Sequence, residues 1–242
     1  MRLNAYLASC GAASRRKSEI MIFEGRVHVN NKIVLAPFFD VDIEHDEVKL
    51  DNKILKFQEH VYYVINKPSG YVCAASDKYD KVILDLIPEK NKRLYPIGRL
   101  DRDSEGLLII TNDGAFTQSI MHPSHEIKKQ YEALLNIEIN SKQLERWRKG
   151  FELENDSGEK KFVKPISVDL ITREPDNKWI SITIVDGIKR EIRLMAKQAG
   201  FRVEKLIRRK IGNLKLENLK SGEFVSLSFS DLYSKILNGG IV

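Results

Sequence analysis

The chain has little of what several classes of protein depend on. It has two cysteines, Cys10 and Cys73, which lie far apart among its 242 residues without a Cys/His cluster around either. A structural zinc site needs four ligands at short paired spacings, so we expect two reduced thiols. No apolar run reaches the roughly 18 residues of a membrane-spanning helix, and residues 1–17 lack the apolar core of a signal peptide. We therefore expect a cytoplasmic protein that does not enter the membrane.

Motifs that bind nucleotides or activate a serine are also missing. The sequence has no G-x-x-x-x-G-K-[ST] loop, no G-x-G-x-x-G after a predicted strand and no G-x-S-x-G elbow. The histidines His122 and His125 are close in sequence, but Pro123 lies between them, so a helical metal pair is not expected. We therefore predict an activity that uses no metal and no cofactor.

Positive charge is abundant, and it is concentrated in two segments. The formal net charge is +6 and the isoelectric point is near 9.1. Residues 1–34 contain six Lys/Arg against two Glu, and residues 188–220 contain eleven against three acids, whereas residues 35–60 contain three against seven. A charged run is often only a solvated face. Two basic segments at opposite ends of the chain nevertheless favour a nucleic-acid partner.

Two short helices and a few strands are predicted at the beginning of the chain. Apolar residues recur at helical spacing over residues 2–10 and again over 15–23, where Ser14 is placed to cap the helix. The alternating residues 27–34 predict a hairpin, and a further strand ends near Asp51. A unit of this size would be marginally stable on its own.

A larger domain follows a short polar stretch. We predict a linker over residues 57–61 that separates a domain over 1–56 from one over 62–242. Strands and helices mix in the larger domain without a regular βαβ rhythm, so we predict an α+β fold with a largely antiparallel, mixed sheet. Strands are expected at 107–112, 129–135, 166–171 and 179–185, and helices at 141–149 and 190–199.

Residues 98–114, GRLDRDSEGLLIITNDG, place three carboxylates directly before an apolar run. On a strand, Asp101, Asp103 and Glu105 would share one face and could bind the magnesium ion of a nuclease. In a loop they would diverge, and Asp101, flanked by two arginines, is the acid that we expect to be held in place. A nearby arginine keeps a partly desolvated aspartate ionised, as nucleophilic or base catalysis requires. A solvated surface acid is the simpler alternative.

Several segments along nearly the whole chain resemble, in order, the motifs of one known family. The segments YPIGRLDRDSEGLLIITNDG and RLNAYLASCGAASRRKSEIMIFEGRVHVNNKIV resemble, respectively, the signature and the S4 RNA-binding module of the RNA pseudouridine synthases that act on ribosomal RNA and carry an N-terminal S4 domain. INKPSGYVC, KKQYEALL, DGIKREIRLM and LIRRKIG resemble its other motifs. The resemblance implies an S4-like domain followed by a catalytic domain that isomerises uridine to pseudouridine.

The resemblance also implies roles for single residues. Asp101 matches the catalytic aspartate, Tyr131 matches the tyrosine that stacks on the target base, and Arg193 matches the basic residue that pairs with the aspartate. Leu206 matches an apolar residue beside the tyrosine, and the cleft is expected to include Arg99 and Lys67 as well. Basic residues expected on the RNA backbone are Arg15, Arg16, Lys17 and Arg26 in the first domain, and Lys205, Arg208, Arg209 and Lys210 beside the cleft.

Some choices remain open at this stage. Just before Arg193 the chain reads Ile188-Lys189-Arg190, where many members have Arg-Asn/Tyr-Arg/His. The expected partner is ribosomal RNA or a pre-ribosomal particle, and the motifs KREIR and LIRRKIG favour the large-subunit (23S) RNA. The small-subunit (16S) RNA and a non-catalytic S4-type RNA-binding protein are the alternatives. Asp101 would either attack C1′ or act as a base at C2′ to give a glycal. We expect a monomer.

Overall fold

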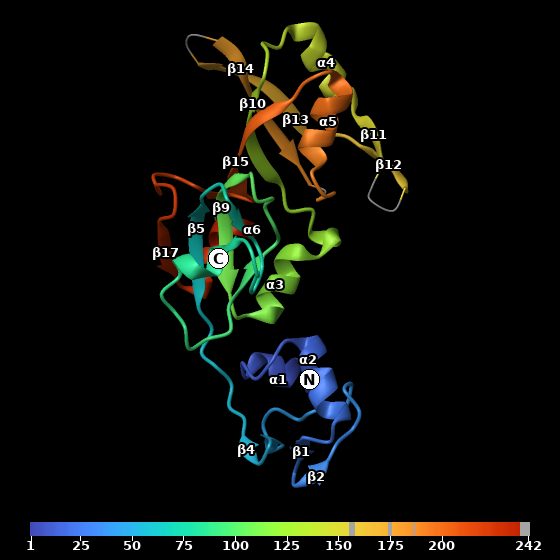
Figure 1. Ribbon diagram of the computed structural model, residues 1–242, viewed down its shortest axis with the longest axis vertical. Helices are drawn as coiled ribbons and strands as arrows, with labels where there is room; N and C mark the ends of the chain where they lie inside the picture. Colours follow the sequence, from blue (N-terminus) through green and yellow to red (C-terminus); the bar gives the residue numbers. More distant parts are fainter. Residues whose placement is uncertain (155–157, 174–175, 186, 238–242) are drawn as a thin grey trace. The chain divides into compact units, whose positions relative to one another are not determined.

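The computed structural model describes residues 1–154, 158–173, 176–185 and 187–237 (Figure 1). The chain divides into two compact units, each described here by itself. The first unit comprises Met1–Val61, Pro88–Leu94 and Asn112–Ala115, and the second comprises Tyr62–Ile87, Tyr95–Thr111 and Phe116–Val242. The linker over residues 57–61 stays a prediction. None of the described helices combines the length and the low charge that crossing a bilayer requires.

The first unit begins with the two predicted helices, α1 (Leu3–Ser9) and α2 (Arg15–Phe23). Ser14 caps α2, because its Oγ accepts a hydrogen bond from the backbone N–H of Lys17 at 3.2 Å. Four short antiparallel strands follow in the order β2-β1-β3-β4. They are β1 (Val27–Val29), β2 (Lys32–Ile33), β3 (Val48–Leu50) and β4 (Lys53–Ile54).

A small apolar core joins the helices of the first unit to its sheet. Leu3, Ile22 and Val27 have no exposed surface and belong to one cluster. The predicted hairpin turns at Asn30 and Asn31, whose φ angles are +49° and +62°. Asparagine tolerates this left-handed conformation, which two-residue hairpin turns require. The sequence prediction of two helices and a hairpin is therefore confirmed.

The second unit is built around a nine-stranded sheet within the described residues (Figure 1). Its path is β13-β14-β10-β15-β9-β5-β17, with β8 paired to β9 and β16 paired to β15. The pairs are antiparallel except for β9 with β15, which confirms the predicted α+β fold. The strands are β5 (Tyr62–Lys67), β8 (Tyr95–Ile97), β9 (Glu105–Thr111), β10 (Lys129–Leu135), β13 (Ser167–Arg173), β14 (Asp176–Ile184), β15 (Val203–Ile211), β16 (Leu214–Lys215) and β17 (Phe224–Leu227).

Two apolar cores lie along this sheet, and β15 contributes to both. Leu206 belongs to the core with α4 and α5, while the next residue, Ile207, belongs to the core with α3 and α6. Successive residues of a strand point to opposite faces, so one strand serves two cores. The helices are α3 (Gly114–Met121), α4 (Ser141–Lys149), α5 (Glu191–Ala199) and α6 (Phe229–Leu237). Smaller elements are the parallel pair β6 (Tyr71–Val72) and β7 (Lys81–Val82), the hairpin β11 (Phe151–Glu154) and β12 (Lys160–Val163), and the 3-10 turns Ile83–Leu86 and Pro123–His125.

The strand β9 begins at Glu105, two residues earlier than predicted. Glu105 and Gly106 pair with Ile207 and Arg208 of β15 in the parallel register. Gly106 has a φ of +107°, and a Cβ placed on it would lie 2.3 Å from the carbonyl oxygen of Arg208. Glycine is therefore required where the two backbones meet. The turn-forming character of this stretch predicted a loop, but pairing with a distant strand overrides it.

Candidate active site

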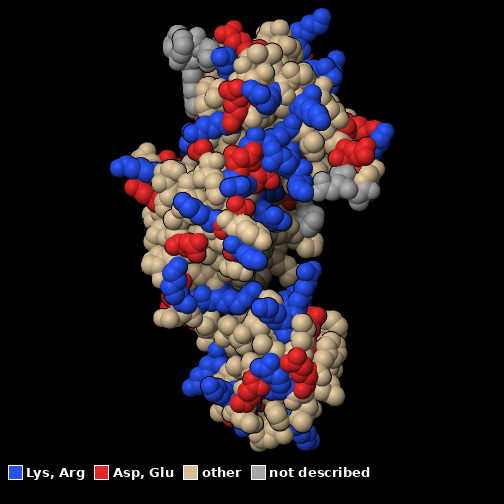
Figure 2. Space-filling view, in the orientation of Figure 1, with Lys and Arg blue, Asp and Glu red and all other residues tan. Residues whose placement is uncertain are grey.

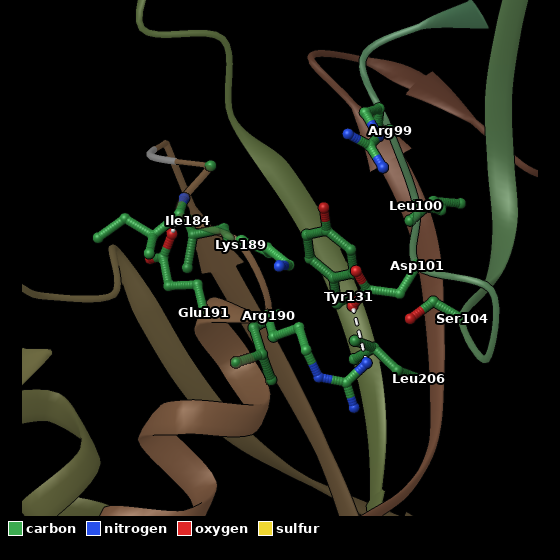
Figure 3. A pocket seen from close by; sticks show the side chains of 13 residues that line it. Arg99, Leu100, Asp101, Ser104, Tyr131, Ile184, Lys189, Arg190, Glu191 and Leu206 are labelled. Carbon is green, nitrogen blue, oxygen red and sulfur yellow. Dashed lines mark hydrogen bonds and ion pairs between the residues drawn. The ribbon is translucent and has the colours of Figure 1, made fainter. Parts of the chain in front are cut away.

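The loop over residues 98–104, between β8 and β9, forms one wall of a pocket of about 260 Å³ (Figure 3). The other walls are formed by Tyr131 from β10, Ile184 from β14, Leu206 from β15 and residues 187–192, which lead into α5. A single water needs roughly 10–15 Å³, so the pocket can admit a ring-sized ligand. The structure thus brings together four of the predicted residues: Arg99, Asp101, Tyr131 and Leu206.

The predicted aspartate lies in a loop that the backbone holds firmly. The N–H of Ser104 donates to the carbonyl oxygen of Asp101 at 3.1 Å, which closes a tight turn. The N–H of Leu100 donates to Sγ of Cys73 at 3.4 Å, and the N–H of Gly70 donates to the carbonyl oxygen of Arg102 at 2.8 Å. The loop is therefore fixed at several points around Asp101.

Lys67 was expected to line the cleft, and this expectation is wrong. Its side chain has no exposed surface and is not part of the pocket wall. Its ammonium group donates to the carbonyl oxygens of Pro68, Arg102 and Ser104 at 3.1, 3.3 and 2.7 Å. Burial is the main cause that lowers the pKa of Lys67 below its ordinary value, and nearby acidic groups oppose it. Lys67 acts on the site through the loop that it holds.

Two arginines of the α5 region face two aspartates of the loop. Nη1 of Arg190 lies 3.7 Å from Oδ2 of Asp101 and 3.3 Å from Oδ1 of Asp103. Nη2 of Arg193 lies 3.0 Å from Oδ2 of Asp103. Figure 3 shows the guanidinium group of Arg190 reaching the carboxylate of Asp101 beside the ring of Tyr131.

Arg193 therefore does not have the partner that the resemblance implied. Its Nη1 donates to the carbonyl oxygen of Val203 at 2.9 Å, and its Nη2 donates to the carbonyl oxygen of Asp103 at 3.2 Å. These bonds fix the guanidinium group against the Asp103 end of the loop. The ion pair with Asp101 is made instead by Arg190, which sequence reasoning noted without giving it a role.

Burial and the neighbouring charges together shift the pKa of both Asp103 and Arg193. Burial raises the pKa of Asp103, but the hydrogen bond from Arg190 and the charges of Arg193 and Arg190 outweigh it, so the pKa falls below its usual value. Burial lowers the pKa of Arg193, and the charge of Asp103 opposes that effect. Asp103 is therefore a fixed anion between two cations at neutral pH.

The backbone of Arg190 is strained at the point where it meets the pocket. Its φ is +59° and its ψ is +26°, the left-handed conformation, immediately before α5. This conformation is uncommon outside glycine and asparagine, and it tends to persist where surrounding contacts hold it at a functional site. Arg190 and Arg193 are three residues apart where the chain enters α5, and this pair of arginines close in sequence is the signal that sequence reasoning missed.

Tyr131 and Leu206 occupy neighbouring central strands. Tyr131 is 7% exposed and Leu206 is 6% exposed, and both belong to the same apolar core. Ala133 on β10 is directly opposite Leu206 on β15, so the tyrosine lies one side-chain position along the same sheet face. An aromatic ring and an aliphatic side chain thus form an apolar wall opposite the charged loop.

The basic residues expected on RNA fall into two groups. Arg15, Arg16 and Lys17 are exposed on α2 and remain available. Arg26 is engaged by Asp51 at 2.6 Å and by Glu24 at 3.2 Å. Figure 2 shows lysine and arginine side chains over both units, with acidic side chains among them on the face in view.

The expectation for Arg208 is wrong. Its side chain is 3% exposed, and its Nε donates to the carbonyl oxygen of Leu107 at 2.7 Å, so it ties β15 to β9. Three other basic residues of β15 are partly exposed. They are Lys205, which pairs with Glu105 at 3.2 Å, Arg209, which pairs with Glu132 at 2.8 Å, and Lys210.

The three acids Asp101, Asp103 and Glu105 do not converge on one point. Asp101 and Asp103 face arginines, while Glu105 pairs with Lys205. Within the described part of the chain, no three His, Cys, Asp or Glu side chains are placed to share a metal ion. The carboxylates of a magnesium nuclease would converge on the ion, whereas these three are paired with arginine or lysine side chains.

Comparison with known proteins places this chain in a defined class. The family model for the S4 domain matches residues 1–48, and the model for RNA pseudouridylate synthase matches residues 61–198. Together they describe an isomerase with an RNA-binding domain in front of its catalytic domain. The chain belongs to the RNA pseudouridylate synthase family, as the sequence motifs predicted.

Relatives of similar length support this assignment. An uncharacterized RNA pseudouridine synthase of Aquifex aeolicus is 37% identical over 96% of this chain and 92% of its own length. The ribosomal large subunit pseudouridine synthase B of Bacillus subtilis is 36% identical over 92% of this chain and 90% of its own length. A crystal structure of a pseudouridylate synthase is 28% identical, covers 98% of this chain and all of its own, and superposes with a TM-score of 0.68.

Proposed function

We propose that this protein isomerises a uridine of ribosomal RNA to pseudouridine, and that its substrate is the large-subunit RNA. The observation that carries the proposal is the carboxylate of Asp101, which lies on the wall of the pocket opposite Tyr131 and is ion-paired to Arg190. The similarity to a large-subunit synthase over most of both chains supports the choice of RNA. The small-subunit RNA remains the second candidate, because no described residue contact distinguishes the two.

The reaction exchanges one glycosidic bond for another. The bond between N1 and C1′ breaks, the uracil rotates, and a bond forms between C5 and C1′. The proton leaves C5 and N1 gains one, so the reaction is balanced without an oxidant, a reductant or a phosphate donor. Asp101 either attacks C1′ or removes a proton from C2′ to give a glycal, and an ionised, oriented carboxylate serves both routes.

The roles that we assign to the other residues of the site follow from their positions. Tyr131 stacks on the uracil and accepts the C5 proton, either directly or through a water. Leu206 covers the apolar side of the base, and Arg99 lies at the exposed rim. Arg190 pairs with Asp101 and orients its carboxylate, while Arg193 acts through Asp103. A base in structured RNA must leave its stack to enter such a pocket.

The rest of the chain positions the RNA. We assign residues 1–56 to the S4 domain, 57–61 to a linker and 62–242 to the catalytic domain. Arg15, Arg16 and Lys17 bind phosphates, which fixes the substrate without reading its sequence. The enzyme works as a cytoplasmic monomer on free ribosomal RNA or on a pre-ribosomal particle.

Tritium release tests the proposal. Ribosomal RNA transcripts labelled with [5-³H]uridine are incubated in EDTA with the wild type, Asp101→Asn and Glu105→Gln. Isomerisation releases the C5 tritium to water, so we expect release by the wild type and by Glu105→Gln, but not by Asp101→Asn. The same reactions are examined for strand cleavage on a gel.

Each alternative predicts a different pattern. A magnesium nuclease would cleave the RNA, stop in EDTA and lose activity in Glu105→Gln. A non-catalytic RNA-binding protein would bind the transcripts without releasing tritium. Release from small-subunit transcripts and not from large-subunit transcripts would reassign the substrate while retaining the chemistry.

A further inference from the structure

Ser104 carries a hydroxyl group that the proposed mechanism does not yet use. The residue is 1% exposed and lines the pocket. Its backbone is fully engaged, because the N–H donates to Asp101 and the carbonyl oxygen accepts from Lys67. Its Oγ is buried, yet it finds no hydrogen-bond partner among the residues that the structure describes.

A buried hydroxyl without a partner destabilises a folded protein. Buried polar side chains are nearly always hydrogen-bonded, so each exception calls for a physical explanation. A leucine or alanine here would avoid the penalty, whereas a hydroxyl that meets its partner only when the pocket is filled would gain one hydrogen bond on binding. Figure 3 shows Ser104 on the same wall as Asp101, with its oxygen turned inward.

The neighbour of Ser104 indicates which part of a nucleotide it would meet. Ser104 and Asp101 are the two ends of one turn, joined by a 3.1 Å hydrogen bond. Under either proposed route, Asp101 acts on C1′ or C2′, so the group beside this turn is the ribose. The 2′-hydroxyl is attached to C2′ and both donates and accepts hydrogen bonds, as a serine hydroxyl does.

We propose that the hydroxyl of Ser104 binds the 2′-hydroxyl of the target nucleotide, so that this residue selects a ribonucleotide and places its sugar against Asp101. The inference rests on the proposed function and extends it to the sugar. The 2′-hydroxyl is the group that lets a protein distinguish RNA from DNA at a given position.

The test combines a protein variant with a substrate variant. The modified uridine is located first with the wild type. Short RNA fragments then carry uridine or 2′-deoxyuridine at that position, and a fragment with the deoxy substitution one nucleotide away is the substrate control. Dissociation constants are measured for the wild type and Ser104→Ala, so that each hydroxyl is removed separately and then together.

Ser18→Ala is the matched protein control. Ser18 has no exposed surface, and its Oγ likewise lacks a partner among the described residues, but it lies on α2 outside the pocket. Both variants remove a buried, unpartnered hydroxyl, so neither should lower the melting temperature. Ser18→Ala should leave turnover unchanged.

The expected result is a loss of discrimination. The wild type should bind the uridine fragment roughly threefold to tenfold more tightly than the 2′-deoxyuridine fragment, which is the net effect of one hydrogen bond. Ser104→Ala should bind the two fragments equally and release tritium more slowly from the uridine fragment. Its melting temperature should stay at the wild-type value or rise.

Several results would overturn the inference. Discrimination that survives in Ser104→Ala would assign the 2′-hydroxyl to another group. A clear fall in the melting temperature of Ser104→Ala would show that the hydroxyl supports the fold. These outcomes leave a wild-type enzyme that still isomerises uridine, whereas a wild type inactive on every RNA would overturn the proposed function and this inference with it.

Discussion

Replacing Arg190 with glutamine should slow the chemical step, because this side chain makes the ion pair with Asp101. Nη1 of Arg190 and Oδ2 of Asp101 are 3.7 Å apart. Coulomb's law at this distance gives about 1 kcal/mol in a water-like medium and about 4.5 kcal/mol at an effective dielectric constant of 20. The side chains are 45% and 28% exposed, so the lower part of this range applies. A loss of about 1–2 kcal/mol lowers the rate about 5-fold to 30-fold.

The assay is single-turnover tritium release at saturating RNA, which reports the step after binding. Arg202→Gln is the matched control, because Arg202 is an exposed arginine that pairs with Glu204 at 3.3 Å and does not line the pocket. We expect wild-type release from the control and slow release from Arg190→Gln, with similar melting temperatures. Wild-type release from Arg190→Gln would refute the assignment of Arg190 as the partner of Asp101.

Three further predictions concern the fold, the acid range and RNA binding. Gly106→Ala should lower the free energy of unfolding by about 2–4 kcal/mol in urea titrations, since its Cβ would meet the carbonyl oxygen of Arg208 at 2.3 Å; an unchanged midpoint would contradict this. The arginines keep the pKa of Asp103 low despite its burial. Asp103→Asn should therefore lower the free energy of unfolding by about 0.5–1 kcal/mol near pH 7. That difference from the wild type should hold above about pH 4 and vanish as the pH falls through the lowered pKa; a difference independent of pH would count against it. Arg16→Ala should weaken RNA binding and reduce the slope of log affinity against log salt by about 0.7–0.9; an unchanged slope would remove Arg16 from the RNA contact.

The local elements were predictable because their signals are local. The helix over residues 141–149 has a clear periodicity, and it forms as α4 with those bounds, capped by Asn140. The turn at Asn30 and Asn31 carries its own conformational preference. In both cases the residues that specify the structure lie within the element, so tertiary contacts only reinforce it.

β15 could not be recognised in the same way. Its run Arg208-Arg209-Lys210 breaks the alternation that marks a strand, and the structure accommodates it with a register shift opposite Gln130 and Tyr131. One of these charged residues, Arg208, can be buried because the carbonyl oxygen of Leu107 accepts a hydrogen bond from its Nε. That hydrogen bond joins segments that are far apart in the chain, so no local sequence pattern predicts it.

The candidate site likewise has some features that local sequence predicts and others that depend on distant contacts. Asp101 and Tyr131 could be named from motifs, and the structure places both at one pocket. The ion pairs of the site could not be predicted from the sequence. Which of the two nearby carboxylates, Asp101 or Asp103, pairs with Arg190 or with Arg193 depends on the three-dimensional positions of the side chains. The 3.0 Å contact between Arg193 and Asp103 depends on the conformation of the loop and of the start of α5. Sequence spacing alone does not determine these conformations.

The parallel pairing of β9 with β15 determines when the pocket can form during translation. β9 follows directly on the loop that holds Asp101, and β15 supplies both its neighbour in the sheet and the Leu206 wall of the pocket. A nascent chain emerges with its N-terminal domain first. The S4 domain is thus exposed well before the pocket can close, and RNA modification must wait until translation has passed residue 211 and the strand is free to join the sheet.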